Sequence, residues 1–351
     1  MAVIWKKNGR KLKIEVQDFG ITIKGDKRVE VISYIKGVAI IAIIFRHLIG
    51  DYLSDIPELF KILSMVGGAG IHVFFFCSGF GLFWAPNNHY DNVLNYAKDR
   101  LRKVYLPYVI VVITIFVIGI RGRNIYALMS HIFFYKMFIP RYDESFGAHF
   151  WYMSTIFQLY ALYPILIKIK QRMRKTSFAV WSIAISLIWT LIIVMFGKYQ
   201  IRTWNGFAFA YLFEFSLGIY FAEGLKENVI VINKWTIWMV MIVAMTLYGV
   251  LGVKGGVYSA FNDIPGFAGM LAFCVLIYSV SGKKVKKAIC LVSDYSYELY
   301  LTHVLVFDLF FEFLKLEGVV IELIIAICAL VCCGIVAILY KVLMHRTIRI
   351  I

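Results

Sequence analysis

Ten apolar stretches, each close to the length that crosses a bilayer, constrain what this chain can fold into. They lie at approximately 32–50, 62–85, 104–120, 150–168, 177–196, 205–222, 236–253, 264–281, 292–313 and 320–343. A hydrocarbon core requires about 20 apolar residues in helical form. Because 61% of the residues are hydrophobic and only 17% are charged, the sequence predicts an all-α, polytopic membrane helix bundle of about ten transmembrane helices.

The segments between these stretches define the expected organisation. An eleventh apolar stretch, Ile125 to Ile139, contains Ser130, His131 and Lys136. We expect this stretch to be interfacial or re-entrant, because it is too short to span easily. Residues 1–30 lack the apolar core of a signal peptide and are expected to form a cytoplasmic N-terminal tail. We assign 31–345 to one membrane domain and 346–351 to a short cytoplasmic tail.

The distribution of positive charge predicts the orientation in the membrane. Most of the 37 Lys and Arg residues fall in one alternating set of segments, which includes both ends of the chain. Since Lys and Arg concentrate on the cytoplasmic side, both termini should be cytoplasmic. The net charge of +16 follows from this topology and from attraction to anionic lipid, so it does not indicate nucleic-acid binding.

The six cysteines lie in or at the ends of apolar helices and lack the spacing of metal ligands. They are Cys77, Cys274, Cys290, Cys328, Cys332 and Cys333. We therefore expect neither disulfides nor a metal site.

Lys36 and His47 lie eleven residues apart in the first predicted span. A helix separates them by about 16 Å along its axis, so Lys36 belongs near the inner end and His47 toward the outer end. An ionisable residue within a span indicates a functional site by default. The alternative is a structural histidine that hydrogen-bonds to its neighbours.

Further polar residues gather at both predicted membrane faces. Near the inner face are Ser78 and the basic run Arg100-Leu101-Arg102-Lys103. That run is either an ordinary topology signal or an anion site, because Arg side chains and helix N-termini both suit phosphate oxygens. Near the outer face are His149 and Trp151, followed by Gln158. Trp151 is either a substrate contact or an interfacial anchor.

The remaining polar groups in the spans are candidates for either a functional or a structural role. Tyr300 and His303 belong to an unusually polar half of the ninth span. Glycines in the second span, Gly67, Gly68, Gly70, Gly79 and Gly81, favour close helix packing. Glu214, Asp308 and Glu312 are expected to pair with Arg46 or a histidine, or to face a wet cavity.

Together these motifs resemble the acyltransferase family 3 integral membrane proteins, which O-acylate surface sugars in bacteria. The matching pieces are Lys36-Gly37 with His47; Gly67 to Phe80; Arg100 to Pro107; Trp151-Tyr152-Met153-Ser154 with Gln158, Tyr160 and Pro164; and Ser296 to His303. The family usually has Arg where this chain has Lys36, and Lys cannot form a bidentate guanidinium contact. Many members also carry acidic residues where Ile156 and Phe157 stand here. This chain resembles the stand-alone form of the family.

The resemblance implies an O-acyltransferase of the bacterial plasma membrane, with acetyl-CoA or another acyl-CoA as co-substrate and no tightly bound cofactor. It assigns the donor phosphates to Arg100, Arg102, Lys103 and Lys36, with Ser78 in the same site. It makes His47 the general base or the nucleophile, and it places His303 and Tyr300 beside His47 or along the passage between leaflets.

The implied acceptor is a surface glycan or glycolipid that approaches past His149, Trp151 and Gln158. A different class of protein, a transporter or flippase of lipid-linked sugars with histidine proton relays, also fits ten helices with polar residues at mid-depth. Within the enzyme class, a non-glycan acceptor is a further alternative. The oligomeric state stays open.

Overall fold

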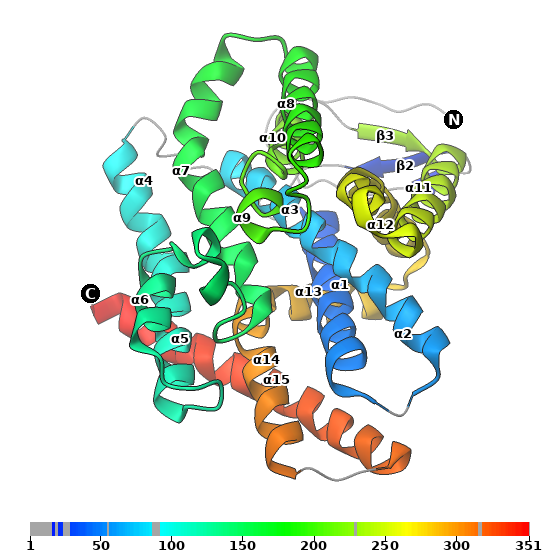
Figure 1. Cartoon of the computed structure of the whole chain (residues 1–351). Helices are drawn as coiled ribbons and strands as arrows, with labels where there is room; N and C mark the ends of the chain where they lie inside the picture. The colour runs from blue at the N-terminus through cyan, green and yellow to red at the C-terminus, as the bar shows by residue number, and fades with distance from the viewer. Residues whose placement is uncertain are drawn as a thin grey trace.

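A computed structural model describes residues 16–17, 20–23, 29–54, 56–85, 92–227, 230–314 and 318–350. The described chain is a bundle of helices with one small sheet at its edge (Figure 1). Most of the expected N-terminal tail, residues 1–30, lies outside the described residues, and so does residue 351 of the expected C-terminal tail.

Each of the ten predicted stretches overlaps a long helix, which in two cases continues from the short helix that precedes it. In chain order these are α1 (Glu30–His47), α2 (Glu58–Met65) with α3 (Gly70–Trp84), α4 (Val93–Arg100) with α5 (Leu106–Ile118), α7 (Trp151–Gln171), α8 (Lys175–Met195), α10 (Leu212–Glu227), α11 (Lys234–Lys254), α12 (Asp263–Val280), α14 (Ser296–Leu314) and α15 (Val319–Ile350). Eight of these segments are long and apolar enough to cross a membrane. The polytopic helix bundle is confirmed.

Two of the ten predicted helices, α10 and α14, are not among the eight segments that are long and apolar enough to cross a membrane. Helix α10 has only 16 residues, because turns occupy residues 207–211 and delay its start. Helix α14 carries three acidic residues, Glu298, Asp308 and Glu312. The predicted ninth stretch is also divided: α13 (Lys283–Asp294) ends before α14 begins at Ser296, with Tyr295 between them.

The eleventh apolar stretch forms a short helix and turns. Helix α6 (Ile125–Ile132) has eight residues, and the 3-10 turns η5 (Lys136–Phe138), η6 (Pro140–Tyr142) and η7 (Ala148–Phe150) follow it. We call residues 121–150 the outer segment, after its predicted side of the membrane. Three other short elements are α9 (Arg202–Asn205), η2 (Val66–Ala69) and η8 (Gly256–Phe261).

The small sheet is a departure from a purely helical fold. Strands β1 (Val16–Gln17), β2 (Gly20–Ile23) and β3 (Ile230–Asn233) pair in that order, and both pairs are antiparallel. The β2–β3 register matches Gly20 with Asn233 and Ile23 with Ile230. The sheet therefore joins the N-terminal segment to the connection between α10 and α11, and the charge distribution predicts the same side of the membrane for both.

Helix α1 lies at the centre of the bundle, in contact with α3, α12, α13 and α14 (Figure 1). Glycines permit this close packing. A β carbon on Gly37 would overlap the Ile289 carbonyl of α13, and one on Gly67 would overlap the Ala42 carbonyl of α1. Helices α3 and α10 cross in the same way, because Gly79 faces the Phe215 carbonyl and Gly218 faces the Phe76 carbonyl. The packing role predicted for Gly67 and Gly79 is therefore confirmed.

The α3–α10 crossing predicts a position-specific effect of adding one methyl group. Gly79→Ala should destabilise the protein by about 1–3 kcal/mol, because the methyl group has no room beside the Phe215 carbonyl. Gly81→Ala is the matched control, since nothing lies within 4 Å of a β carbon there. Thermal unfolding in detergent measures both. Equal melting temperatures for the two variants would contradict the tight crossing.

Candidate active site

His47 is hydrogen-bonded to a carboxylate one turn further along the chain. Helix α1 ends at His47, and the following residues form the π turn η1 (Leu48–Tyr52). This turn brings the Asp51 Oδ2 atom to 2.7 Å from the His47 Nδ1 atom. The Arg46 Nη1 atom donates to the Asp51 Oδ1 atom at 3.2 Å. A carboxylate on Nδ1 orients the imidazole and directs Nε2 away from it.

Gly50 is part of this arrangement because the Arg46 side chain occupies the space beside it. A β carbon at Gly50 would overlap the guanidinium of Arg46. The absence of a side chain at this position therefore lets Arg46 reach Asp51. Insertions of the π type are frequent at functional sites, since they redirect side chains within an otherwise regular helix.

Two further histidines surround His47. The His303 ring of α14 lies 5.3 Å from the His47 ring, and the His149 ring of η7 lies 6.1 Å from it, between ring centroids. The His149 and His303 centroids are 5.2 Å apart. The His47 side chain is 24% exposed, whereas His149 and His303 are buried. Three elements far apart in sequence thus bring three imidazoles together, and we call these residues the histidine cluster.

The hydrogen bonds of the buried histidines indicate their tautomers. The His303 Nδ1 atom lies 2.9 Å from the carbonyl oxygens of both Leu299 and Tyr300. Carbonyls only accept, so Nδ1 carries the hydrogen and Nε2 carries a lone pair. Among the described residues, His303 Nε2 and both ring nitrogens of His149 have no hydrogen-bond partner. Buried polar atoms without partners are costly, so they favour a polar molecule bound here.

Tyr300 positions His149 and makes no hydrogen bond to His47. Its hydroxyl donates to the His149 carbonyl oxygen at 2.5 Å. Its ring also packs against His149 and against Tyr152 of α7. The residue that orients His47 through a hydrogen bond is Asp51, which the sequence reasoning did not select. The spacing of four residues from His47 was the available signal, although Asp51 lies beyond the predicted span.

A second set of polar residues lies toward the other end of α1. The guanidinium of Arg100 lies between the rings of Tyr96 and Tyr160, at 5.8 Å and 5.7 Å from their centroids. Both Arg100 and Ser78 interact with the Tyr160 hydroxyl. The Arg100 Nε atom is buried and has no hydrogen-bond partner among the described residues. Lys36 is half-buried and lies close enough to Cys77, the neighbour of Ser78, to interact electrostatically with it.

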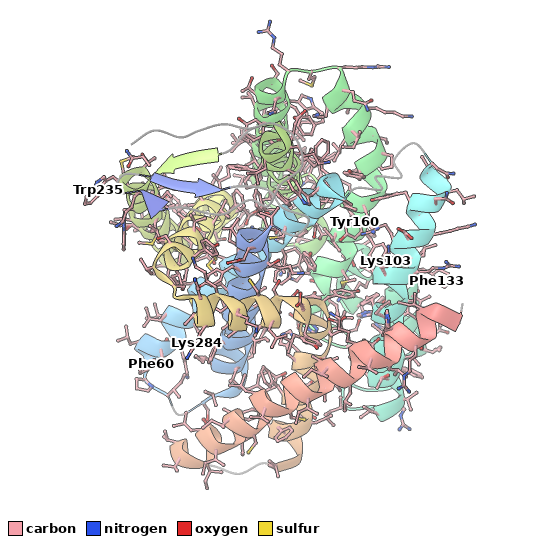
Figure 2. The ribbon with its side chains drawn as sticks, turned by 180° about the vertical axis from the view of Figure 1, so that it is seen from behind. Phe60, Lys103, Phe133, Tyr160, Trp235 and Lys284 are labelled. Carbon is pink, nitrogen blue, oxygen red and sulfur yellow. The ribbon has the colours of Figure 1, made fainter. Side chains whose placement is uncertain are left out.

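The other two basic residues of the predicted donor site lie apart from this group. Arg102 and Lys103 are exposed, in the π turn η4 (Leu101–Tyr105). Lys103 pairs with Asp99 at 3.0 Å and lies on the outside of the bundle (Figure 2). The structure therefore brings Ser78 and Arg100 together at Tyr160 and places Lys36 near the adjacent Cys77. We call Lys36, Ser78 and Arg100 the inner cluster, and Arg102 and Lys103 lie apart from it at the surface.

Trp151 and Gln158 lie on α7, the helix that follows His149 in the chain. The Arg202 guanidinium lies 4.7 Å from the Trp151 ring centroid. The Gln158 carbonyl oxygen accepts from the Ala208 amide at 3.1 Å, and its amide nitrogen donates to the Ser154 carbonyl at 3.2 Å. Gln158 therefore fixes the turn that precedes α10. Contact of either residue with a substrate stays a prediction.

Two of the acids within the spans, Glu214 and Asp308, form ion pairs or hydrogen bonds whose partners the sequence does not specify. Glu214 of α10 bonds to the His72 Nδ1 atom at 2.7 Å, so its partner is a histidine. Asp308 of α14 accepts from the Nε and Nη2 atoms of Arg121 at 2.6 and 2.7 Å. Its partner is therefore Arg121 and not Arg46.

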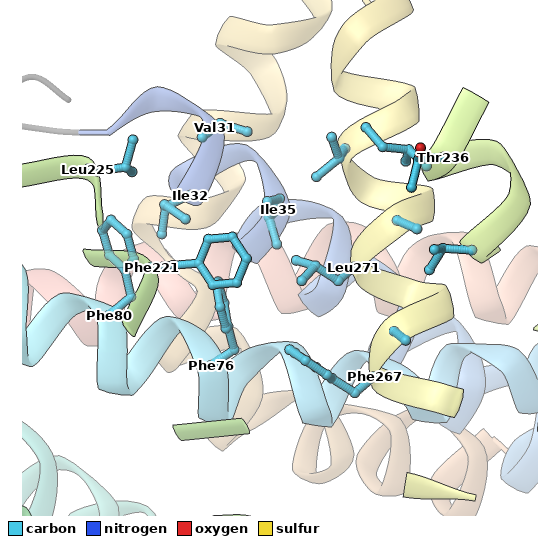
Figure 3. Close-up of a pocket in the computed structure, with 15 residues that line it drawn as sticks. Val31, Ile32, Ile35, Phe76, Phe80, Phe221, Leu225, Thr236, Phe267 and Leu271 are labelled. Carbon is cyan, nitrogen blue, oxygen red and sulfur yellow. The ribbon is translucent and has the colours of Figure 1, made fainter. Parts of the chain in front are cut away.

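An apolar cavity of about 340 Å³ lies between α1, α3, α10, α11 and α12. Val31, Ile35, Phe76, Phe221 and Phe267 are among the side chains that line it (Figure 3). None of its lining residues is ionisable, so it cannot supply acid or base groups. The lining residue of α1 nearest to His47 is Ile35, which lies about 18 Å from it along the helix axis. The cavity is therefore separate from the histidine cluster.

Comparison with protein families gives one match, an acyltransferase domain (Acyl_transf_3) over residues 29–341. This range contains the histidine cluster and the inner cluster. Comparisons with curated proteins and with solved structures find no match to this chain.

Proposed function

The chain belongs to acyltransferase family 3, and from this premise we propose that it is a membrane-embedded O-acyltransferase of the bacterial plasma membrane. The proposed reaction moves an acyl group, acetyl in the simplest case, from cytosolic acyl-CoA to a hydroxyl of a cell-surface glycan or glycolipid. One observation carries the proposal: the His47–Asp51 pair lies beside two buried histidines, and three of their ring nitrogens have no hydrogen-bond partner in the part of the chain that the structure describes.

His47 is the proposed general base. With Asp51 accepting from Nδ1, the Nε2 atom of His47 holds the lone pair that removes the proton from the acceptor hydroxyl. The Asp51 carboxylate then stabilises the imidazolium through the same hydrogen bond. A second hydrogen bond from Arg46 keeps Asp51 in place. This use of a carboxylate and an imidazole is common to many acyl-transfer sites.

The chemical step balances without another reagent. The acceptor oxygen attacks the thioester carbonyl carbon as its proton passes to His47, and a tetrahedral oxyanion forms. Collapse of that intermediate breaks the carbon–sulfur bond and leaves an ester on the acceptor. The proton on His47 then passes to the departing thiolate, so free coenzyme A is released and the imidazole returns to its starting form.

The two buried histidines offer complementary groups to this step. His303 presents a lone pair on Nε2, which suits a hydrogen bond from an acceptor hydroxyl. A neutral His149 has one N–H to donate, and this group suits the oxyanion. The Tyr300 hydroxyl donates a hydrogen bond to the His149 carbonyl oxygen and so holds His149 in place. Tyr300 is therefore a positioning residue.

The inner cluster is the proposed site for the phosphates of the donor. Arg100 offers a guanidinium with a free Nε–H, Lys36 offers an ammonium and Ser78 offers a hydroxyl; all of these suit phosphate oxygens. Lys36 and His47 are separated by about 16 Å along α1. A donor held by its phosphates at Lys36 therefore needs its long arm to extend along α1, so that the thioester reaches the histidine cluster.

The assignment of the base predicts the effect of two substitutions. His47→Ala and Asp51→Asn should each lower kcat for acyl transfer by about 100-fold or more, because they remove the base or its orienting acceptor. The KM for acetyl-CoA should change little. Transfer of labelled acetyl groups by purified protein to a surface-glycan fraction gives both constants.

Two matched controls accompany these variants. His345→Ala alters an exposed histidine of α15, and Asp99→Asn alters an acid in a surface ion pair. Both should retain wild-type kcat. The catalytic assignment is wrong if His47→Ala transfers acetyl groups at the wild-type rate while it is present at normal membrane levels.

The donor site predicts a difference between two arginines that are close in sequence. Arg100→Gln should raise the KM for acetyl-CoA by about 10-fold, because it removes a charge-assisted contact to phosphate. Arg102→Gln should have a much smaller effect, since Arg102 is exposed on η4. Steady-state kinetics with varied acetyl-CoA measure this. A change that appears only in the dependence on acceptor would show that the phosphate site is elsewhere.

A further inference from the structure

Lys136 is a fully buried cation that the proposed reaction does not use. It lies in η5 of the outer segment, and its exposed fraction is 0%. Its Nζ atom has no hydrogen-bond partner among the described residues. Burial of an unpaired ammonium is strongly unfavourable, so such a group is either neutral or paired with an anion that the protein itself does not supply.

The acids near Lys136 act on it without a hydrogen bond to its ammonium. Asp143 and Glu144 act on it at longer range, and Arg202 of α9 adds a second positive charge. Glu144 is exposed, so water screens its charge, whereas Asp143 is only partly exposed. Arg202 is also acted on by Asp263 of α12. Among the described residues, none of these carboxylates hydrogen-bonds to the Lys136 ammonium, so the ammonium has no direct anionic partner there.

The position of Lys136 connects it to the acceptor side of the proposed site. The adjacent Met137 accepts a hydrogen bond from Thr203 at its carbonyl, and its sulfur lies 3.1 Å from the Gln158 amide nitrogen. Arg202 lies over Trp151. Lys136 is also close enough to His149 to act on it electrostatically. Of the residues assigned to the acceptor, Lys136 is thus close to His149 and is linked to Gln158 through Met137 and to Trp151 through Arg202.

We propose that Lys136, supported by Arg202, binds an anionic group of the acceptor, so that the preferred acceptor is a hydroxyl compound carrying a carboxylate or a phosphate. This inference rests on the proposed function. An acidic sugar is the simplest such compound. Its anion pairs with the ammonium while a hydroxyl of the same sugar reaches the histidine cluster, and the charge thereby fixes which hydroxyl is presented.

The protonation of Lys136 is consistent with this role. Burial lowers its pKa to about 7, so near neutral pH the empty site holds a mixture of amine and ammonium. A bound carboxylate or phosphate stabilises the ammonium and raises the pKa again. The site thereby avoids a permanently unpaired buried charge and still presents a full charge to an anionic ligand.

The test compares two sugars that differ only in charge. Methyl glucuronide carries a carboxylate, and its carboxamide is a neutral analogue of nearly the same shape. With labelled acetyl-CoA, kcat/KM for the acid should exceed that for the amide by about 10-fold or more in the wild-type protein. In Lys136→Met this preference should fall to about one. The exposed Lys254→Met is the matched control and should keep the wild-type preference.

Binding without the donor provides a second measurement. The acid should raise the melting temperature of the wild-type protein more than the amide does, and Lys136→Met should respond equally to both. Lys136→Met should itself be at least as stable as the wild type, since it replaces a buried unpaired cation by an apolar chain of similar size. Loss of folding is therefore not expected to obscure the comparison.

The outcomes separate this inference from the proposed function. Equal transfer to, or equal binding of, the acid and the amide by the wild-type protein overturns the inference and leaves O-acyl transfer intact. An equal loss of turnover on both sugars in Lys136→Met also overturns it, because Lys136 would then serve the reacting centre. Preferential binding of the acid without transfer to either sugar would support the anion site and count against the proposed function.

Discussion

The hydrogen bond between His47 and Asp51 is the interaction on which the proposed chemistry depends. An imidazole at the end of a membrane helix becomes a directed base only when one ring nitrogen is fixed, and the π turn after α1 supplies the carboxylate that does this. The rings of His149 and His303 lie 6.1 and 5.3 Å from the His47 ring, between centroids. Without Asp51 the ring would be free to rotate, and neither tautomer would be favoured.

Close helix packing places this pair where it can act. Gly37 and Gly67 allow α13 and the segment before α3 to approach α1, so α1 lies at the centre of the bundle and carries a polar group toward each end. Buried ions elsewhere are paired, as Glu214 with His72 and Asp308 with Arg121 show. Several buried polar atoms of the described residues have no hydrogen-bond partner, and those of His149, His303, Arg100 and Lys136 belong to the proposed donor, acceptor or catalytic sites.

Much of the fold followed from the sequence, because apolar length and charge asymmetry are strong signals for membrane helices. His47 and His303 were also predicted, since polar residues are rare within spans, and His149 was predicted as an outer-face residue just before the fourth span. Asp51 was missed because it lies just beyond a span, where acids are unremarkable. The break at Tyr295 and the late start of α10 were not predicted, because a continuous apolar run does not indicate where a helix is interrupted or begins. Side-chain partners such as Arg121 for Asp308 depend on tertiary packing, which a single sequence does not specify.

A structure of the protein with a non-reactive thioether analogue of acetyl-CoA would show where the donor phosphates and the acyl group bind. The phosphates should contact Arg100 and Lys36, the arm should follow α1, and the acyl carbon should lie within contact distance of the histidine cluster. Density for the acyl group in the apolar cavity lined by Phe76 and Phe267, far from His47, would contradict this arrangement.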